Sequence, residues 1–409
     1  MDNYEAVCAS PALSGQVKLS LTDEGLTIEA LFDTALITFA EMNAVSLSNY
    51  VVTLETNGGV YSFSRMGSWC EPFYDALSDS YNAAVLKALF IDDKPCVTAT
   101  GDFGYIEGAH TASGRAAFAV YESCVSLLPP NLDARRVPLC FAVGMDKGNF
   151  SLTLRLNTGE SYTFSKLGYD TAPFEEAIVK NIRALRERAL AAVKEIDPAL
   201  SSAQAAQISK LLPEGAAASI GKLSAIAPSF VKAVEQKLAA GRAAESYKVF
   251  QQLSDPMKIH VGLRRKTPGE LAAELEAAEA AAAKIAEAGG EAPELTPPDP
   301  FLLWLIAPSS DLRYAAVEFA EENSATYVYS TGGDFDSFVG RLNRALEALS
   351  FKREAIRLSD DQLLSPDHAV YYMAAKRTAA LQFVRAHLAG RAIHSSSTAW
   401  KKKLLELMK

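Results

Sequence analysis

A segment that occurs twice constrains the fold of this chain more than any other feature. The first copy, Asn49 to Leu77, reads NYVVTLETNGGVYSFSRMGSWCEPFYDAL, and the second, Asn149 to Ala177, reads NFSLTLRLNTGESYTFSKLGYDTAPFEEA. Both copies alternate apolar and polar residues around a turn, as two antiparallel strands do, and then change to the spacing of a helix. The chain is therefore expected to contain two copies of a strand, turn, strand and helix unit.

The residues before the first unit extend the predicted sheet. Gln16 to Leu21, Leu26 to Leu31 and Ala35 to Phe39 alternate in the same way, and Asp23 to Gly25 has the composition of a turn. Three short strands are therefore expected before the first unit. Antiparallel pairing is the simplest topology for them.

About seven short antiparallel strands followed by one helix resemble the pleckstrin-homology (PH)-like fold. The likeness rests on a strand, an Asn-Gly or Thr-Gly turn, a Tyr-x-Phe-Ser strand, a loop with glycine, and a Pro-Phe pair that opens a helix. It implies an α+β fold of repeated PH-like units, each an antiparallel β-sandwich or barrel capped by its C-terminal helix. The resemblance carries no catalytic signature.

Composition shifts along the chain predict five parts. Beyond residue 196, short helices are broken by proline and glycine, and Ala325 to Ser330 is similar to the Tyr-x-Phe-Ser strand of the first two copies. The parts expected are PH-like domain 1 (1–92), PH-like domain 2 (93–196), a helical segment (197–256), a degenerate PH-like domain 3 (257–352) with a helical insertion at 268–289, and a C-terminal helical region (353–409).

The overall composition indicates a folded, acidic protein. Among 409 residues, 49% are hydrophobic and 22% charged, which is too apolar for disorder, and the net charge of −9 makes nucleic acid an improbable partner. Five cysteines without CxxC spacing predict free thiols in a reducing compartment. The absence of a secretion signal or a continuous apolar stretch then predicts a cytoplasmic protein. The alanine-rich stretch from Glu270 to Ala288 would suit a GC-rich bacterial genome.

No motif in the sequence specifies a reaction. Gly101 to Gly104 contains the letters of a kinase magnesium motif, but its companion motifs are missing, so it is interpreted as a turn between strands. Thr111 to Arg115 lacks the spacing of a phosphate-binding loop and is also interpreted as a loop. The histidines show no metal-ligand spacing. No catalytic residue, metal or cofactor is predicted, and the protein is expected not to be an enzyme.

Each repeat places a hydroxyl and a cation directly after its Tyr-x-Phe strand. The pairs are Ser64 with Arg65 and Ser165 with Lys166. Such a pair could hold a phosphate or carboxylate through charge-assisted hydrogen bonds. The alternative is a solvated strand end, where the same residue types are common.

Two basic clusters interrupt the acidic sequence. The first comprises Lys258, Arg264, Arg265 and Lys266, which lie on a predicted first strand of domain 3, a place where phosphate-binding PH domains carry basic residues. The second, Lys401 to Lys403, lies near the end of the chain. Solvated turns and a helix C-terminus are the plainer interpretations.

These observations favour a non-enzymatic binding or scaffolding protein with a protein or peptide partner. The partner would bind between the last strand and the C-terminal helix of a unit, or at an exposed sheet edge. One alternative is binding to an anionic ligand or a membrane surface through the basic clusters. Another is an enzyme with its site at a domain junction.

Overall fold

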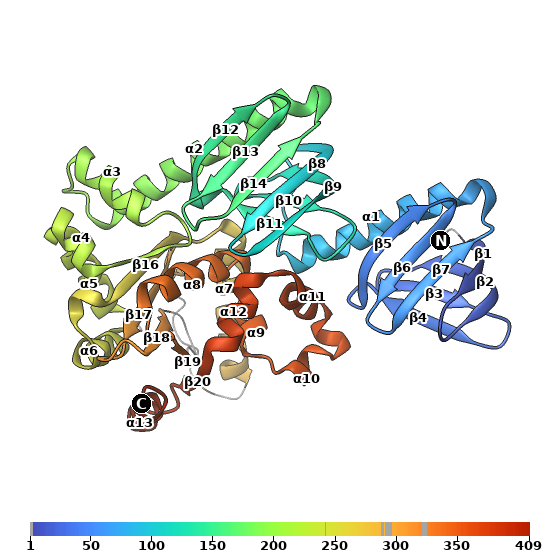
Figure 1. Ribbon diagram of the computed structural model, residues 1–409. Coiled ribbons are helices and arrows are strands. Elements are labelled where there is room, and N and C mark those ends of the chain that lie inside the picture. Colours follow the sequence, from blue (N-terminus) through green and yellow to red (C-terminus); the bar gives the residue numbers. More distant parts are fainter. Residues whose placement is uncertain (1–2, 242, 288–289, 291–296, 321–324) are drawn as a thin grey trace. The chain divides into compact units, whose positions relative to one another are not determined.

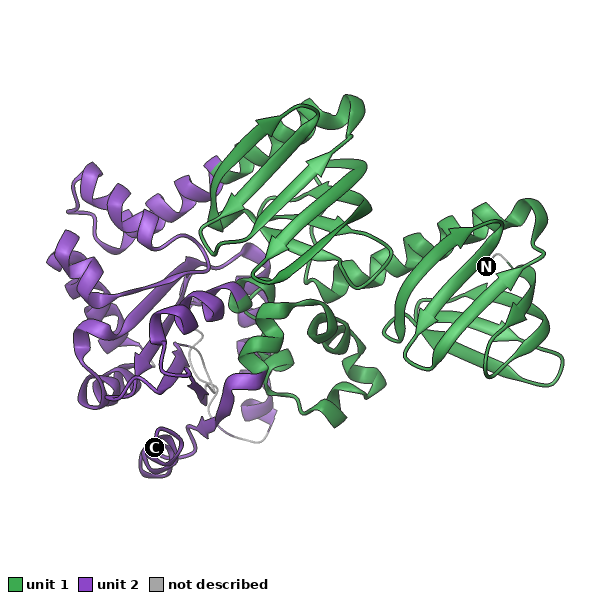
Figure 2. Ribbon diagram, viewed as in Figure 1, with its two compact units in different colours: residues 1–182, 345–385 green, residues 183–344, 386–409 purple. Residues whose placement is uncertain are grey.

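The computed structural model describes residues 3–241, 243–287, 290, 297–320 and 325–409 (Figure 1). The chain is α+β and divides into two compact units (Figure 2). Unit 1 contains Met1–Ile182 and Ala345–Arg385, and unit 2 contains Arg183–Arg344 and Ala386–Lys409.

Unit 1 begins with a seven-stranded antiparallel sheet, which we call the first sheet. Its strands are β1 (Asn3–Ala9), β2 (Ser14–Leu21), β3 (Gly25–Glu29), β4 (Thr34–Thr38), β5 (Met42–Ser48), β6 (Val51–Thr56) and β7 (Gly59–Ser64). They are ordered β4-β3-β2-β1-β7-β6-β5, so that β4 and β5 form the two edges. The helix α1 (Cys70–Ala88) follows the last strand.

The second sheet of unit 1 has the same strand order. Its strands are β8 (Val97–Glu107), β9 (His110–Val120), β10 (Cys124–Leu128), β11 (Arg135–Pro138), β12 (Ala142–Gly148), β13 (Ser151–Leu156) and β14 (Ser161–Ser165), and they are followed by α2 (Thr171–Ile196). The order β11-β10-β9-β8-β14-β13-β12 matches the first sheet strand for strand. The predicted repetition of a structural unit is therefore confirmed.

The residues shared by the two copies form the contact between the last strand and the helix. Phe63 and Phe73 lie with ring centroids 6.0 Å apart in the first copy, and Phe164 and Phe174 lie 5.2 Å apart in the second. All four side chains are fully buried. The alternation of the strand and the Pro-Phe start of the helix thus place one aromatic side chain from each element in the same core.

Two segments that the sequence analysis assigned to a turn and to a loop are strands, so both predictions were wrong. Gly101 to Gly104 lies inside β8, and Thr111 to Arg115 lies inside β9. A Cβ atom on Gly101 would lie 2.4 Å from the carbonyl oxygen of Ser165, so glycine is needed there because the neighbouring chain passes so close. Glycine marks a close approach of two strands here, where the sequence analysis read it as a turn.

The C-terminal part of unit 1 consists of short helices: α9 (Glu354–Arg357), α10 (Asp360–Leu363), α11 (Ala369–Arg377) and α12 (Ala379–His387). Helices α11 and α12 are separate because Thr378, between them, has extended backbone angles. Arg377, which is buried, donates a hydrogen bond to the Tyr81 hydroxyl of α1 at 2.6 Å. This contact joins the C-terminal part of the unit to its first domain.

Unit 2 contains a six-stranded antiparallel sheet with helices around it. In order across the sheet, its strands are β15 (Ala217–Ser219), β16 (His260–Arg265), β17 (Phe301–Pro308), β18 (Tyr314–Phe319), β19 (Ala325–Ser330) and β20 (Leu388–Ile393). Its helices are α3 (Ser202–Leu211), α4 (Ile220–Ile226), α5 (Pro228–Ala240), α6 (Ala244–Leu253), α7 (Pro268–Glu287), α8 (Phe335–Ala348) and α13 (Ser397–Leu407).

The third predicted domain corresponds to the middle of this sheet. Strands β16 to β19 and the inserted helix α7 lie at the expected residues, but the sheet also includes β15 and β20, which come from outside 257–352. Every residue of β17 is buried, which indicates that both faces of the sheet are covered. The end of the predicted helical insertion, residues 288–289, lies outside the described residues, as do residues 291–296 after it.

Candidate functional site

The hydroxyls of the two predicted Ser and cation pairs bind the neighbouring strand. The Ser64 hydroxyl donates to the carbonyl oxygen of Val7 at 3.4 Å, and the Ser165 hydroxyl donates to that of Asp102 at 3.3 Å. The following residues, Arg65 and Lys166, have left-handed φ angles of 60° and 57°. Each pair therefore ends its strand in the same way. The shared backbone conformation shows that these positions have a structural role at the end of the strand.

The cations of the two pairs differ in their surroundings. Lys166 Nζ lies 2.5 Å from Asp102 Oδ2 in the second sheet, whereas the equivalent neighbour of Arg65 in the first sheet is Val7. Of these two cations, Lys166 is thus paired with a carboxylate of the neighbouring strand, whereas Arg65 has an apolar residue at the equivalent position. The structure brings neither pair together with another predicted site residue.

The predicted basic cluster of unit 2 is neutralised by carboxylates. Three consecutive cations each pair with a carboxylate: Arg264 with Glu270, Arg265 with Glu195, and Lys266 with Glu274 at 2.6 Å. The side chain of Lys266 is also buried. Lys258 lies apart from them, in the turn before β16. An anionic ligand at this cluster would have to displace carboxylates that already fill it.

The C-terminal lysines lie on α13. Lys401 Nζ is 2.8 Å from Glu245 Oε1, and Lys403 Nζ is 3.9 Å from Glu406 Oε2. The same helix buries Trp400 fully. The apolar side of α13 is thus buried within unit 2. Part of its positive charge is already paired with glutamate side chains.

A polar cluster that the sequence analysis did not predict lies at one end of the second sheet. The Tyr105 hydroxyl donates to Asp133 Oδ1 at 2.9 Å, and His110 Nε2 lies 3.0 Å from the same hydroxyl. Burial raises the pKa of the Tyr105 phenol, and the hydrogen bond to Asp133 acts in the same direction, whereas the nearby Arg135 opposes them. The phenol therefore remains a proton donor at neutral pH.

The rest of this cluster is an internal ion pair. Arg135 Nε lies 3.0 Å from Glu107 Oε2, and the Tyr162 hydroxyl donates to Glu107 Oε1 at 2.6 Å. The guanidinium also lies over the Tyr105 ring at 4.7 Å. These groups form hydrogen bonds with one another. The cluster thereby holds β11 and the loop before it against β8.

That loop occupies one edge of the first sheet. Val45 N of β5 donates to the carbonyl oxygen of Pro130 at 2.8 Å, and Ala44 forms an isolated bridge with Asn131. An edge strand that is already paired in this way is a poor acceptor for another chain. The β5 edge is therefore not a free binding surface.

The two edges of the second sheet are also protected. All residues of β11 are buried, and Arg136 Nε binds Glu347 Oε1 at 3.0 Å. Strand β12 has a register shift between Ala142 and Gly144 and carries the charged residues Asp146 and Lys147. Short length, bulges and charge all discourage pairing with another strand.

Strand β4 is also short, but it has neither a bulge nor a charged residue. Its register with β3 runs without a shift from Glu29↔Thr34 to Gly25↔Thr38, and its sequence TALIT carries no charge. Within the part of unit 1 that the structure describes, it is the regular, uncharged edge. We define the β4 edge as residues 31–38, the strand with the turn before it.

The hydrogen bonds at the two ends of β4 show which of its backbone groups are unpaired. Ala30 N donates to Asp33 O at 2.8 Å, and Phe39 N donates to Glu24 O at 3.0 Å. Because hydrogen-bonded and non-hydrogen-bonded positions alternate in an antiparallel pair, residues 33, 35, 37 and 39 face β3. The N–H and C=O groups of Thr34 and Leu36 therefore point away from the sheet.

Apolar side chains are exposed at the same place. Leu36 is 44% exposed on the outer face of β4, and Leu31 and Phe32 in the turn before it are 85% and 89% exposed. Turn residues are usually polar, so two large apolar side chains there are unusual. Unpaired backbone and exposed apolar surface thus coincide at the β4 edge.

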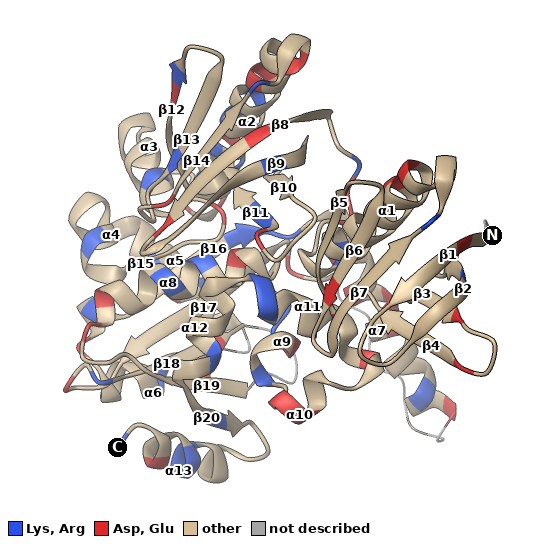
Figure 3. Cartoon of the chain, turned by 45° about the vertical axis from the view of Figure 1, so that its right-hand side comes forward, with Lys and Arg blue, Asp and Glu red and all other residues tan. Residues whose placement is uncertain are grey.

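The surroundings of the β4 edge are acidic. From Asp23 to Glu41 the sequence has five carboxylates and no lysine or arginine (Figure 3). All five acidic residues are exposed. The Glu41 carboxylate accepts hydrogen bonds from Thr38 N at 2.9 Å and Thr38 Oγ1 at 2.8 Å. The outward N–H of Thr38 is therefore already hydrogen-bonded, and the stretch of unpaired backbone groups ends before this residue.

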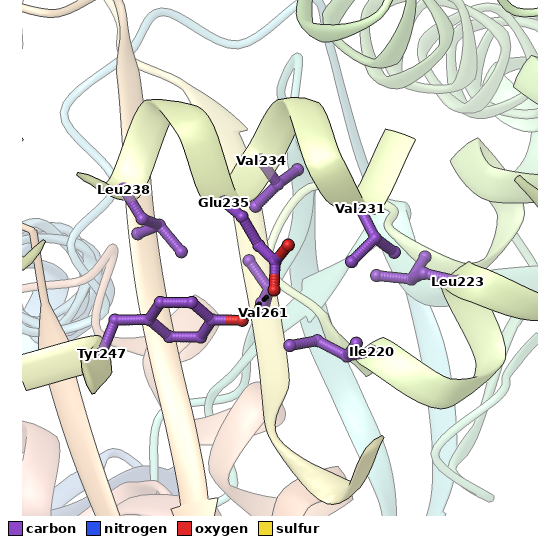
Figure 4. A pocket seen from close by; sticks show the side chains of 8 residues that line it. All are labelled: Ile220, Leu223, Val231, Val234, Glu235, Leu238, Tyr247 and Val261. Carbon is purple, nitrogen blue, oxygen red and sulfur yellow. Dashed lines mark hydrogen bonds between the residues drawn. The ribbon is translucent and has the colours of Figure 1, made fainter. Parts of the chain in front are cut away.

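A small depression in unit 2 is lined almost entirely by apolar side chains (Figure 4). It lies among Ile220, Leu223, Val231, Val234, Glu235, Leu238, Tyr247 and Val261 and holds about 210 Å³, part of which is open solvent. The Glu235 carboxylate accepts a hydrogen bond from the Tyr247 hydroxyl at 2.6 Å. Because binding sites for small molecules usually measure about 300 to 1,000 Å³, this depression is too small for one.

Two further features bear on function. Within the described residues, no group of three or more histidine, cysteine, aspartate or glutamate side chains is placed to hold a metal ion. No helix in that part of the chain combines the length and hydropathy needed to cross a bilayer.

No protein-family model matches the chain, and no curated protein matches its sequence.

Proposed function

We propose that this protein is a non-enzymatic binding or scaffolding protein, that its two repeated sheets are PH-like domains, and that the first sheet binds a protein or peptide partner at the β4 edge. The shared strand order and the helix that follows each sheet support the assignment to PH-like domains. The observation that carries the binding proposal is the coincidence of unpaired backbone groups with exposed Leu31, Phe32 and Leu36.

Strand addition explains why these features occur together. An incoming extended segment would pair with the backbone of Thr34 and Leu36 and would cover the Leu36 side chain. Main-chain hydrogen bonds then supply affinity, while alternate side chains supply specificity. With one or two residues pairing on each side of the interface, a weak, reversible complex is expected.

Substitution at Leu36 tests this binding mode. Leu36→Pro removes the outward N–H that the partner needs, but it breaks no hydrogen bond to β3, because that N–H faces away from the sheet. Leu36→Thr keeps the N–H and serves as the matched control. Peptides selected from a random library on the full chain should lose at least about 10-fold in affinity with Leu36→Pro. They should lose far less with Leu36→Thr.

Circular dichroism and thermal unfolding of both variants check that the fold is kept. If the selection yields no peptide whose binding is sensitive to Leu36→Pro, the strand-addition proposal is wrong.

The other functions considered have less support. Binding of an anionic ligand or membrane at Arg264 to Lys266 competes with Glu195, Glu270 and Glu274. For an enzymatic site, the candidate is the polar cluster around Tyr105, whose hydrogen bonds fasten β11 and its loop to β8. We also propose a cytoplasmic location, in keeping with five free thiols.

A further inference from the structure

We infer that the partner segment is basic, with an apolar residue flanked two positions away on each side by lysine or arginine. This inference rests on the proposed function, because it describes the segment that would pair with the β4 edge. It adds the chemistry of the partner, which exposed backbone alone does not specify.

The position of the apolar residue follows from strand geometry. In an antiparallel pair, residues that lie directly opposite each other place their side chains on the same face of the sheet. The partner residue opposite Leu36 therefore lies beside a leucine that is 44% exposed. An apolar side chain there removes surface from water on both strands.

The positions of the cations follow from two carboxylates on either side of Leu36. Glu29 is the register partner of Thr34, so both side chains lie on the outer face. Glu41 is held at Thr38 by two hydrogen bonds. Thr34 and Thr38 are about 13 to 14 Å apart along a strand. The partner residues two before and two after its apolar residue span the same length.

Nearby cations leave this acidic surface largely uncompensated. Lys18 faces the same region, because it is the register partner of Glu29 on β2. Lys376 lies near Glu41, but its Nζ donates to Ala40 O and to the side chains of Asn43 and Asn57. The two lysines offset only part of the negative charge of the five carboxylates between residues 23 and 41. A positively charged segment therefore complements the site.

The same charges argue against the other occupants of such an edge. A second copy of this chain, paired through its own β4, would bring two sets of acidic residues together. An anionic membrane would be repelled in the same way, although Leu31 and Phe32 have the apolar character of an insertion loop. Like charges at an interface disfavour association, whereas complementary charges accelerate it.

Three labelled, end-capped peptides test the inference by fluorescence polarisation with the full chain. They are Thr-Lys-Thr-Leu-Thr-Lys-Thr, the same peptide with glutamate for lysine, and the same peptide with threonine for leucine. Two exposed ion pairs should make the first bind roughly 2- to 30-fold more tightly than the glutamate peptide. This preference should shrink at about 0.5 M salt. The peptide without leucine should bind more weakly than the first at either salt concentration.

The double variant Glu29→Gln/Glu41→Gln should remove the preference for the basic peptide, because both side chains keep their size and glutamine can still accept from Thr38 N. The matched control is Glu5→Gln/Glu55→Gln. It neutralises two exposed acidic residues of the same sheet, on β1 and β6, and should keep the preference.

The outcomes separate the inference from the proposed function. Equal binding of the basic and acidic peptides, abolished by Leu36→Pro, would overturn the inference and leave strand addition standing. Binding of the basic peptide that is unchanged by Leu36→Pro would overturn both. A dimer that dissociates with Leu36→Pro, or binding to anionic vesicles that is lost with Phe32→Ser, would replace the basic segment with another occupant.

Discussion

At the scale of single residues, the half-buried Lys376 is held by neutral partners. Its Nζ donates to Asn43 Oδ1 at 2.6 Å, to Asn57 Oδ1 at 3.1 Å and to Ala40 O at 3.2 Å. These partners are neutral oxygens of the first sheet, while Lys376 belongs to α11. Burial, together with the neighbouring Arg377, lowers the pKa of Lys376 to about 8.

This lowered pKa predicts a pH dependence of stability. Between about pH 8 and the ordinary lysine pKa of about 10.4, the unfolded chain binds more protons at this residue than the folded chain does. The contribution of Lys376 to the free energy of unfolding therefore rises with pH across that window and is constant below it. Lys376→Met should remove this rise.

Urea unfolding of the wild type and Lys376→Met at pH 6 to 10 measures the effect. The difference in free energy of unfolding should be constant at pH 6 and 7, which provides the internal control, and should then grow in favour of the wild type. A difference that stays constant up to pH 10 would contradict the burial of this ammonium group.

At the scale of elements, the hairpin turns of the two sheets contain aromatic residues where glycine is the usual choice. Tyr50 and Phe150 follow β5 and β12 and have φ angles of 59° and 58°. Both side chains are largely exposed. A bulky residue in the left-handed region is strained, and exposure gives little packing in return.

Replacement of the exposed aromatic should therefore stabilise the second sheet. Phe150→Gly is expected to raise the free energy of unfolding by about 1 kcal/mol, since glycine adopts this conformation without a Cβ clash. Phe150→Ala is the control, because it removes the ring and keeps the Cβ. Chemical denaturation of the three proteins gives the values. A gain with alanine as large as that with glycine would mean that the ring, and not the backbone conformation, is the source of strain.

The sequence predicts the elements of the two repeats well, because the signals that define these elements lie close together in the sequence. Alternation, the Asn-Gly and Thr-Gly turns and the Pro-Phe helix start all act within a few residues. Arg135 and Arg136 form β11, a strand that the local sequence does not indicate, because their carboxylate partners are the distant Glu107 and Glu347. Strand β20 was missed for the same reason, since it is defined by its pairing with β19.

The candidate site escaped prediction because an edge is a property of the whole sheet. The alternation in β4 is visible in the sequence, but its unpaired side depends on the order of seven strands. Leu31 and Phe32 were the available signal, as two large apolar residues next to Asp33 where a turn should be polar. The predicted Ser and cation pairs are real repeats, but their shared feature is backbone conformation.

At the scale of the whole molecule, both units depend on the C-terminal part of the chain. Residues 345–385 belong to unit 1, and residues 386–409 belong to unit 2. Each unit is thus completed by contacts between residues far apart in sequence, which is a feature of slowly folding topologies. The net charge of −9 adds to the acidic field around the β4 edge and favours the approach of a basic partner.

Amide hydrogen exchange of Thr34 and Leu36 in the full chain tests the central claim most directly. In the free protein, these two amides should exchange rapidly, while those of Ala35 and Ile37 are protected by β3. The basic peptide at saturating concentration should slow Thr34 and Leu36 at least about 10-fold, because their N–H groups then enter a strand pair. Protection of Thr34 and Leu36 in the free protein, or peptide binding that leaves their exchange unchanged, would contradict strand addition at this edge.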